Sequence, residues 1–275
     1  INALIVCILG LISLYLVGQQ WDQYISTLPY MFTVQGALIA VVSIVFIKCW
    51  HEFGHGIITK AFGRPVTTMG VAFLFLFPIL YTDTSQAWTI RDKRQRMGID
   101  AAGVGVELLL AILATYAWLV TPDGPWRSAF FMMSSTTWVV SLFVNLNPLL
   151  KFDGYYLLSD YWNLPNMQSR AHAITQWHIR RSFLNWPGEK PEIFPAKLEQ
   201  KLVIYSIAAM LYRIVIFLSI SLFVYAFFFK ALGIALVLLN LVWLIILPLT
   251  KELTIWWSVR KMPEVQKRRS AWLIG

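Results

Sequence analysis

The sequence predicts a polytopic α-helical membrane protein with about six transmembrane helices and a small membrane-associated β or re-entrant element at about residues 68–84. Hydrophobic residues make up 58% of the 275 residues and charged residues 13%, and apolar runs of helical length recur along the chain. Soluble globular proteins carry about twice that charged share. The composition therefore excludes a water-soluble protein.

Six apolar segments are candidates for membrane spans, because a helix needs roughly 20 apolar residues to cross the hydrocarbon core. They cover about 1–18, 34–62, 97–120, 128–158, 202–229 and 231–249. Only Lys230 and Gly233 mark the break between the last two. That pair is therefore also compatible with one bent hairpin or a longer helix.

The basic residues predict the orientation of the spans. Residues 60–96, 159–201 and 250–275 carry six Lys or Arg each, whereas 19–33 carries none and the connections at 121–127 and around 230 carry one each. Because basic loops stay in the cytoplasm, both termini are expected on the cytoplasmic side. The net charge of +9 is spread between apolar runs, which favours the lipid bilayer as a partner and no nucleic acid.

Two segments differ from the spans in pattern. Residues 68–84, TMGVAFLFLFPILYTDT, are rich in β-branched and aromatic residues and contain Pro78, which favours a hairpin or re-entrant element. Residues 159–201 are polar and contain four prolines. We expect them to form a cytoplasmic loop with one amphipathic helix.

The strongest local pattern is His51-Glu52-Phe53-Gly54-His55 in the second span. On a helix, residues i and i+4 share a face, so the two imidazoles can bind one Zn²⁺ beside a glutamate that can act as a base. Ionisable residues inside a span are costly unless they have partners or face a cavity. The pattern therefore predicts a metal site.

A catalytic zinc site typically has three protein ligands, so a third ligand is expected elsewhere in the chain. Asp153 is the best candidate, because it ends the fourth span on the same predicted side as the histidine pair. Pro148 and Gly154 would distort a helix there and turn the carboxylate inward. His172 and His178 lie six residues apart in the polar loop, off a common helix face, and are expected to be solvated or interfacial.

Together these motifs resemble the site-2 protease family of intramembrane zinc metalloproteases. The match consists of HEFGHG at 51–56 and the N-x-x-P and D-G motifs at 145–154. The stretches 81–88 and 147–160, the latter reading NPLLKFDGYYLLSD, make the chain similar to the branch described as peptide zinc metalloproteases. The resemblance covers roughly residues 35–170. It implies an integral protein of a bacterial cytoplasmic membrane whose active site lies toward the cytoplasmic side.

The resemblance also implies a role for each matching residue. His51, His55 and Asp153 would bind one Zn²⁺ per chain. Glu52 would act as general base, and Asn145 would hold the substrate backbone or the developing oxyanion.

The chain departs from the family pattern at two positions. Tyr155 stands where the wider family often has a second glycine after Asp-Gly, and the third-span motif that begins at Gly103 ends in Glu107 where Asn is common. Glu107 places an extra acid in the membrane.

Three residues are candidates for groups that surround the metal ligands: Lys48, Glu107 and Asp83. Lys48 lies three residues before the first histidine, on roughly the same helix side, so it would snorkel or pair with Glu107 or Asp153. Asp83 would face the site or the substrate, although a loop Asp is more often solvated.

These motifs suggest four regions. They are a first transmembrane helix with an external loop (1–33), a metalloprotease core of three helices and the re-entrant element (34–158), a cytoplasmic loop (159–201), and two further helices with a basic tail (202–275).

The leading hypothesis is an intramembrane zinc endopeptidase that hydrolyses a peptide bond in a membrane-inserted or exported peptide. A helical substrate must unwind, and the edge of residues 68–84 could take it up as an added strand. The alternative is a non-proteolytic metal-containing subunit of a peptide export or resistance assembly, with export-complex or adaptor subunits as partners. Glu52 favours chemistry, because a structural zinc site needs no base. A metal transporter would need metal-binding groups along several spans, and the sequence shows one cluster.

Overall fold

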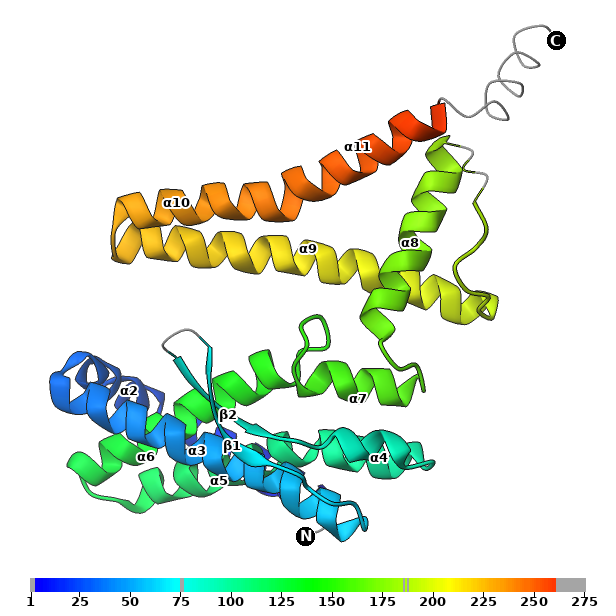
Figure 1. Cartoon of the computed structure of the whole chain (residues 1–275). Helices are drawn as coiled ribbons and strands as arrows, with labels where there is room; N and C mark the ends of the chain where they lie inside the picture. The colour runs from blue at the N-terminus through cyan, green and yellow to red at the C-terminus, as the bar shows by residue number, and fades with distance from the viewer. Residues whose placement is uncertain (1–2, 75–76, 185, 187, 261–275) are drawn as a thin grey trace, which may run out of the picture. The chain divides into compact units, whose positions relative to one another are not determined.

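The computed structural model describes residues 3–74, 77–184, 186 and 188–260 (Figure 1). They are mostly helical, with one two-stranded hairpin, and they divide into two compact units, Ile1–Pro165 and Asn166–Gly275. Four helices or helix runs are long and apolar enough to cross a membrane, and a fifth is added if the bent pair Leu4–Gln19 and Trp21–Phe32 counts as one span. The structure thus supports an integral membrane protein with four or five of the six predicted spans.

The first unit contains most of the helices and the hairpin. Its elements are α1 (Ala3–Gln19), α2 (Trp21–Ile25), η1 (Leu28–Phe32), α3 (Val34–Ala61), β1 (Met69–Leu74), β2 (Phe77–Thr82), η2 (Ser85–Thr89), α4 (Lys93–Asp100), α5 (Ala102–Val120), α6 (Pro125–Val139), η3 (Val140–Asn145) and α7 (Asp153–Tyr161).

Helix α5 packs against both α3 and α6 and forms the centre of this unit. Its buried residues recur at helical spacing and include small ones, Gly103, Ala111 and Ala114. Small side chains let helix backbones approach closely, which is how helices associate in a membrane. On α3, Gly54 has the same function, because a Cβ there would lie 2.9 Å from the carbonyl oxygen of Ala102.

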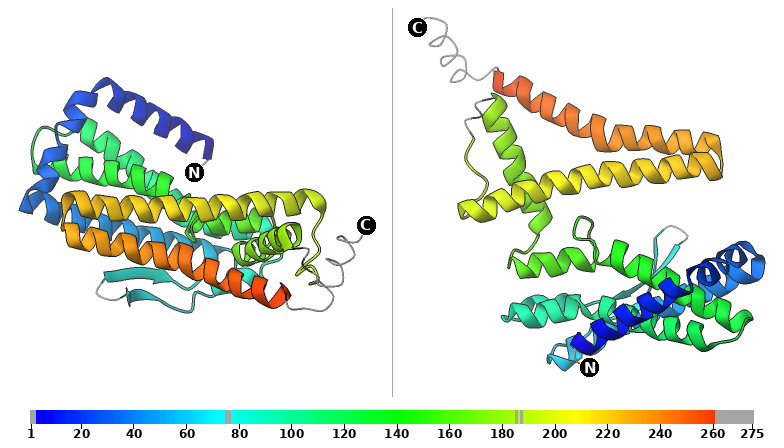
Figure 2. Two further views of the ribbon diagram at one scale, coloured as in Figure 1. Left: turned by 90° about the horizontal axis from the view of Figure 1, so that it is seen from above. Right: turned by 180° about the vertical axis from the view of Figure 1, so that it is seen from behind.

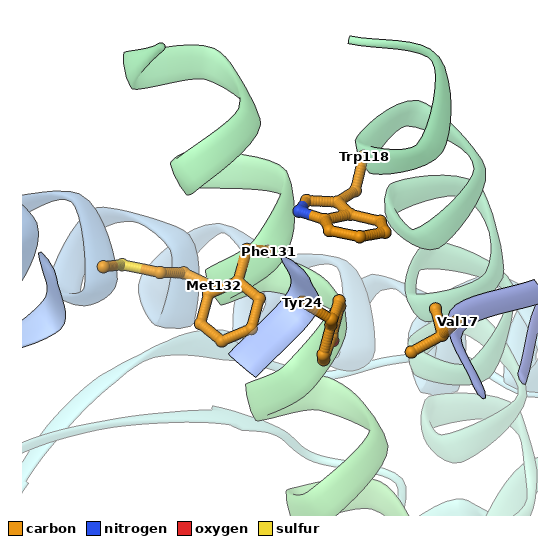
Figure 3. Close-up of a cluster of buried hydrophobic side chains, with 5 residues drawn as sticks. All are labelled: Val17, Tyr24, Trp118, Phe131 and Met132. Carbon is orange, nitrogen blue, oxygen red and sulfur yellow. The ribbon is translucent and has the colours of Figure 1, made fainter. Parts of the chain in front are cut away.

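A cluster of buried, mostly aromatic side chains packs near the C-terminal end of α5 (Figure 3). The Tyr24 ring meets Trp118 and Phe131 edge to face, with centroids 4.9 and 4.6 Å apart. The Tyr24 hydroxyl hydrogen-bonds with Ser134 at 2.7 Å, so the buried polar atom has a partner. Helix α2 is thereby held to α5 and α6, although it has only five residues.

The third and fourth predicted spans differ from the structure. The third, 97–120, is shorter: α5 begins at Ala102, and the polar residues before it belong to the separate helix α4. The fourth, 128–158, is not one helix. Helix α6 passes into a π-helix, η3, which ends at Asn145, and α7 starts only at Asp153. Pro148 has no N–H to donate and so cannot continue the helix through this gap.

The predicted hairpin is confirmed. Strands β1 and β2 are antiparallel, with Met69 opposite Thr82 and Phe73 opposite Pro78. Pro78 fits because this sheet has two strands among the described residues, so β2 is an edge strand. The Thr82 hydroxyl donates to the carbonyl oxygen of Glu52 at 3.0 Å, which ties the base of the hairpin to α3.

The second unit consists of α8 (Met167–Leu184), α9 (Ala196–Phe227) and a run formed by α10 (Lys230–Leu241), η4 (Val242–Ile246) and α11 (Leu247–Arg260). Helix α9 packs antiparallel against α10 (Figure 2). The tight turn requires Gly233, since a Cβ there would lie 2.4 Å from the Cα of Tyr225. Arg180 on α8 forms a two-bond ion pair with Glu252 on α11. The predicted break between the last two spans is therefore real, and the last helix is longer than predicted.

Candidate metal centre

The two histidines of the HEFGH motif lie on one face of α3, as their spacing requires. The Nε2 atoms of His51 and His55 are 3.2 Å apart, and the rings meet at 77°. Their side chains are 7% and 12% exposed. Both Nε2 atoms therefore point to a common position inside the protein.

Asp153 reaches the same position from a distant part of the chain. Its carboxylate oxygens lie 3.2 Å from Nε2 of His51 and 3.6 Å from Nε2 of His55. It opens α7, where the helix dipole favours a carboxylate. The next residue, Gly154, packs so closely on the preceding loop that a Cβ would lie 2.3 Å from the carbonyl oxygen of Leu146. The glycine thus lets the loop deliver Asp153 to the histidines.

The second nitrogen of each ring faces a hydrogen-bond acceptor. Nδ1 of His55 lies 2.8 Å from the carbonyl oxygen of Ile99. Nδ1 of His51 lies 3.0 Å from Oε1 of Glu107, at ion-pair distance but without an aligned hydrogen bond. Acceptors at Nδ1 favour the tautomer whose Nε2 lone pair is available to a metal ion.

The three side chains can hold a metal ion. One ligand atom from each lies within 4.8 Å of the others. Oδ2 of Asp153 is buried without a hydrogen-bond partner, as expected for an oxygen atom that coordinates a cation. Two imidazole nitrogens and a carboxylate oxygen form a donor set that suits Zn²⁺. The residues present therefore fit a zinc ion.

Glu52 lies beside this group and lines the same cavity of about 500 Å³. The cavity is also lined by the three metal-binding candidates and by Leu80, Tyr81 and Thr82 of strand β2. A glutamate, a group that can hold a metal ion and an edge strand thus face one space. This arrangement could bring an extended peptide to the metal-binding residues.

Glu107 is at the centre of a buried polar network next to the histidines. Its carboxylate is 1% exposed and accepts hydrogen bonds from Lys48, Ser141 and Asn145, at 2.7, 2.5 and 2.5 Å. Lys48 therefore pairs with Glu107, one of the two acids considered for it. Asn145 is 5% exposed and is not among the residues that line the cavity.

Asp83 lines the cavity, and it also closes a turn at the base of the hairpin. Its carboxylate accepts hydrogen bonds from the backbone and side chain of Ser85 and from the hydroxyl of Thr67. These bonds lower the pKa of Asp83 to about 2, so the group is ionised at neutral pH.

The sequence analysis did not identify two further acids of the cavity, Asp100 and Asp160. Burial and the neighbouring Asp160 charge raise the pKa of Asp100 to about 8. Asp160 accepts a 2.9 Å bond from the buried guanidinium of Arg96, which also donates to Asn163 and to the carbonyl oxygen of Ile90. Arg96 thereby joins α4 to α7, the helix that carries Asp153. Nothing in the local pattern around Arg96 marks it among the basic loop residues.

His172 and His178, both on α8, are not members of the metal-binding group found among the described residues. Nε2 of His178 is 2.6 Å from Oε1 of Glu199, and Nε2 of His172 is 3.1 Å from the Gln176 amide.

Comparison of the chain with protein-family models, with curated proteins and with solved structures finds no match. Fold and site together define a helical integral membrane protein with a largely buried His-His-Asp group that can hold a metal ion.

Proposed function

We propose that this chain is an intramembrane zinc endopeptidase of the site-2 protease type, which hydrolyses a peptide bond in a membrane-inserted or exported peptide. The observation that carries the proposal is the convergence of His51, His55 and Asp153 in the cavity that Glu52 also lines. A metal site that only stabilises structure is closed and needs no base. Here the cavity leaves room for water and substrate beside a glutamate.

Each residue of the proposed site has a defined task. A zinc ion held by His51, His55 and Asp153 would lower the pKa of water and polarise the scissile carbonyl. Glu52 takes the proton from the attacking water and returns it to the leaving amine, which completes hydrolysis without a net change in the enzyme. The Ile99 carbonyl orients the His55 ring through its Nδ1, and the Glu107 carboxylate lies 3.0 Å from Nδ1 of His51.

The substrate is proposed to be an extended peptide segment. Strand β2 pairs with β1 on one edge, and its residues Leu80, Tyr81 and Thr82 line the cavity. An unwound segment added beside β2 would satisfy its backbone groups, which is necessary at membrane depth. The exposed side chains of Val71, Phe73 and Ile79 give the hairpin an apolar surface suited to a membrane-derived peptide.

The proposal includes six spans with both termini in the cytoplasm. Helix α6 and η3 together run from Pro125 to Asn145, long enough to form the fourth span, and the bent pair of α1 with the following helices would form the first. A reporter fused within 159–201 should then be cytoplasmic and one within 121–127 external. The opposite pattern would invert this topology and move the active site to the far face.

The deciding experiment compares the purified wild-type chain with Glu52→Gln in lipid nanodiscs that contain membrane-spanning peptides. The matched control is Glu189→Gln, an exposed glutamate of the second unit. We expect Glu52→Gln to keep its metal and to lose about 10²–10⁴-fold in cleavage rate, while the control cleaves normally.

An intact precursor that accumulates on Glu52→Gln would reveal the substrate itself. If Glu52→Gln supports the cellular role of the chain at the full level, proteolysis is not that role. The chain would then be a metal-containing subunit of a peptide export or resistance assembly.

A further inference from the structure

We propose that Glu107 is a positioning residue that connects the two ligand-bearing parts of the metal centre. One carboxylate oxygen holds α3, which carries the histidines, and the other holds η3, which leads to Asp153. The inference deepens the proposed function, but it concerns metal binding alone and its test needs no peptide.

The two oxygens of Glu107 divide their partners between two segments. Oε1 lies 2.7 Å from Nζ of Lys48 and 3.0 Å from Nδ1 of His51, both on α3. Oε2 accepts hydrogen bonds from Ser141 and Asn145, each at 2.5 Å and both in the π-helix η3. These segments lie far apart in sequence, and Glu107 on α5 lies between them.

Ser141 and Asn145 lie four residues apart in η3, so their side chains share one face and reach the same oxygen of Glu107. Single π turns inside α-helices are rare, and those that occur are often found at functional sites. Ser141 and Asn145 are both buried and both direct their donors at the same carboxylate oxygen. Since η3 ends at Asn145 and the chain reaches Asp153 only eight residues later, this anchor sets where the loop to the third ligand begins.

A buried carboxylate is costly unless its charge and lone pairs are satisfied. Glu107 meets this condition, because it accepts hydrogen bonds from the Lys48 cation, Ser141 and Asn145, and Nδ1 of His51 lies 3.0 Å from Oε1. A structural packing role would be filled at lower cost by an apolar side chain. The carboxylate is therefore explained by what it orients, namely the His51 ring and the amide of Asn145.

The network also bears on Asn145. Because a carboxylate only accepts hydrogen bonds, the amide of Asn145 must turn its NH₂ group toward Glu107. In this structure Asn145 is thus engaged with Glu107 and is away from the cavity wall. We assign it to the anchoring of η3, in place of the direct contact with substrate that the family resemblance implies.

The test measures the dissociation constants of Zn²⁺ and Co²⁺ by competition with a chelator, with the full chain in detergent. Glu107→Gln should weaken metal binding about 10–100-fold, the usual effect of losing a group that orients a metal ligand. Glu107→Asp keeps the charge but shortens the reach by one methylene group, so it should also bind metal more weakly and change the Co²⁺ absorption spectrum. Glu189→Gln makes the same chemical change at an exposed position outside this network, so it serves as the matched control with affinity near wild type.

A double variant, Lys48→Met with Glu107→Gln, removes both charges and so avoids leaving Lys48 unpaired, which protects folding. If the double variant recovers wild-type affinity, Glu107 merely neutralises Lys48 and the inference is wrong. Wild-type affinity in Glu107→Gln itself would overturn it as well. If the wild-type chain binds zinc but cleaves no peptide, the proposed function is wrong and the inference about Glu107 is unaffected.

Discussion

Gly103 on α5 lies directly against His55 on α3: a Cβ at position 103 would be 2.4 Å from Nε2 of the histidine. This Cβ would also lie 2.5 Å from Cε1 of His51. Real Cβ atoms do not approach other atoms so closely, so one of the elements would have to move. The absence of a side chain at Gly103 therefore leaves room for both imidazole rings.

Gly103→Ala should strongly reduce metal binding. The added methyl group would push the two histidine rings out of their common orientation, and a shift of a few tenths of an ångström matters for a site with fixed ligand distances. Gly105→Ala on the same helix is the control, since a Cβ there meets nothing within 4 Å. Metal content by elemental analysis of both purified variants measures the effect. Equal zinc content in the two variants would contradict it.

All three candidate ligands should be required for metal retention. His51→Ala, His55→Ala and Asp153→Ala should each lose bound zinc after dialysis against a weak chelator, because two ligands do not complete the site. His172→Ala, in the second unit, should bind zinc as well as the wild type does. Stoichiometric zinc in Asp153→Ala would remove that residue from the ligand set.

Arg96→Met should destabilise the first unit by about 3–5 kcal/mol, since it leaves Asp160 as an unpaired buried charge. Helix α7 would lose its link to α4, so metal affinity should fall in parallel although Arg96 is not a ligand. Arg94→Met, an exposed position two residues earlier, is the matched control. Denaturant titration of the metal-free chains in detergent gives the free energies of unfolding. Equal denaturant midpoints for Arg96→Met and Arg94→Met would show that Arg96 does not stabilise the first unit.

The stability of the metal-free protein should decrease as pH rises from about 4 to about 8. The pKa of Asp100 is raised from 3.8 to about 8, so in this window the folded state keeps a proton that the unfolded state has lost. The stabilisation is complete below pH 3.8 and is lost as pH passes the folded pKa. Asp100→Asn should flatten this dependence, whereas Glu189→Gln should not. Melting temperatures measured from about pH 4 to about pH 8 test this prediction. Parallel curves of melting temperature against pH for wild type and Asp100→Asn would refute it.

Local patterns determined much of this protein. The spacing of His51 and His55 on a continuous helix requires that they share a face, wherever that helix packs. The apolar runs identified α3, α9 and the last helix, since hydropathy follows directly from composition. The β-branched stretch with Pro78 indicated the hairpin, and Asp153 was found because a zinc site needs a third ligand.

The prediction from the sequence was wrong where hydropathy did not indicate the backbone conformation. The segment 128–158 is apolar enough for one helix, yet it forms a helix, a π-helix, a loop and a second helix. Hydropathy measures solvation of side chains and is insensitive to one extra residue per turn. In η3, Ser141 and Asn145 donate hydrogen bonds to Glu107 of α5, and hydropathy does not encode these contacts.

Only the tertiary structure decided which groups surround the metal ligands. His55 meets the carbonyl oxygen of a residue 44 positions away, Lys48 meets Glu107 across 59 positions, and Arg96 meets Asp160 across 64. Such contacts depend on the register and rotation with which helices pack, which arise from the sum of many small van der Waals terms over the whole unit. The candidate metal ligands could therefore be predicted from their chemistry and spacing, whereas the groups around them depend on the packing of α3, α5 and α7.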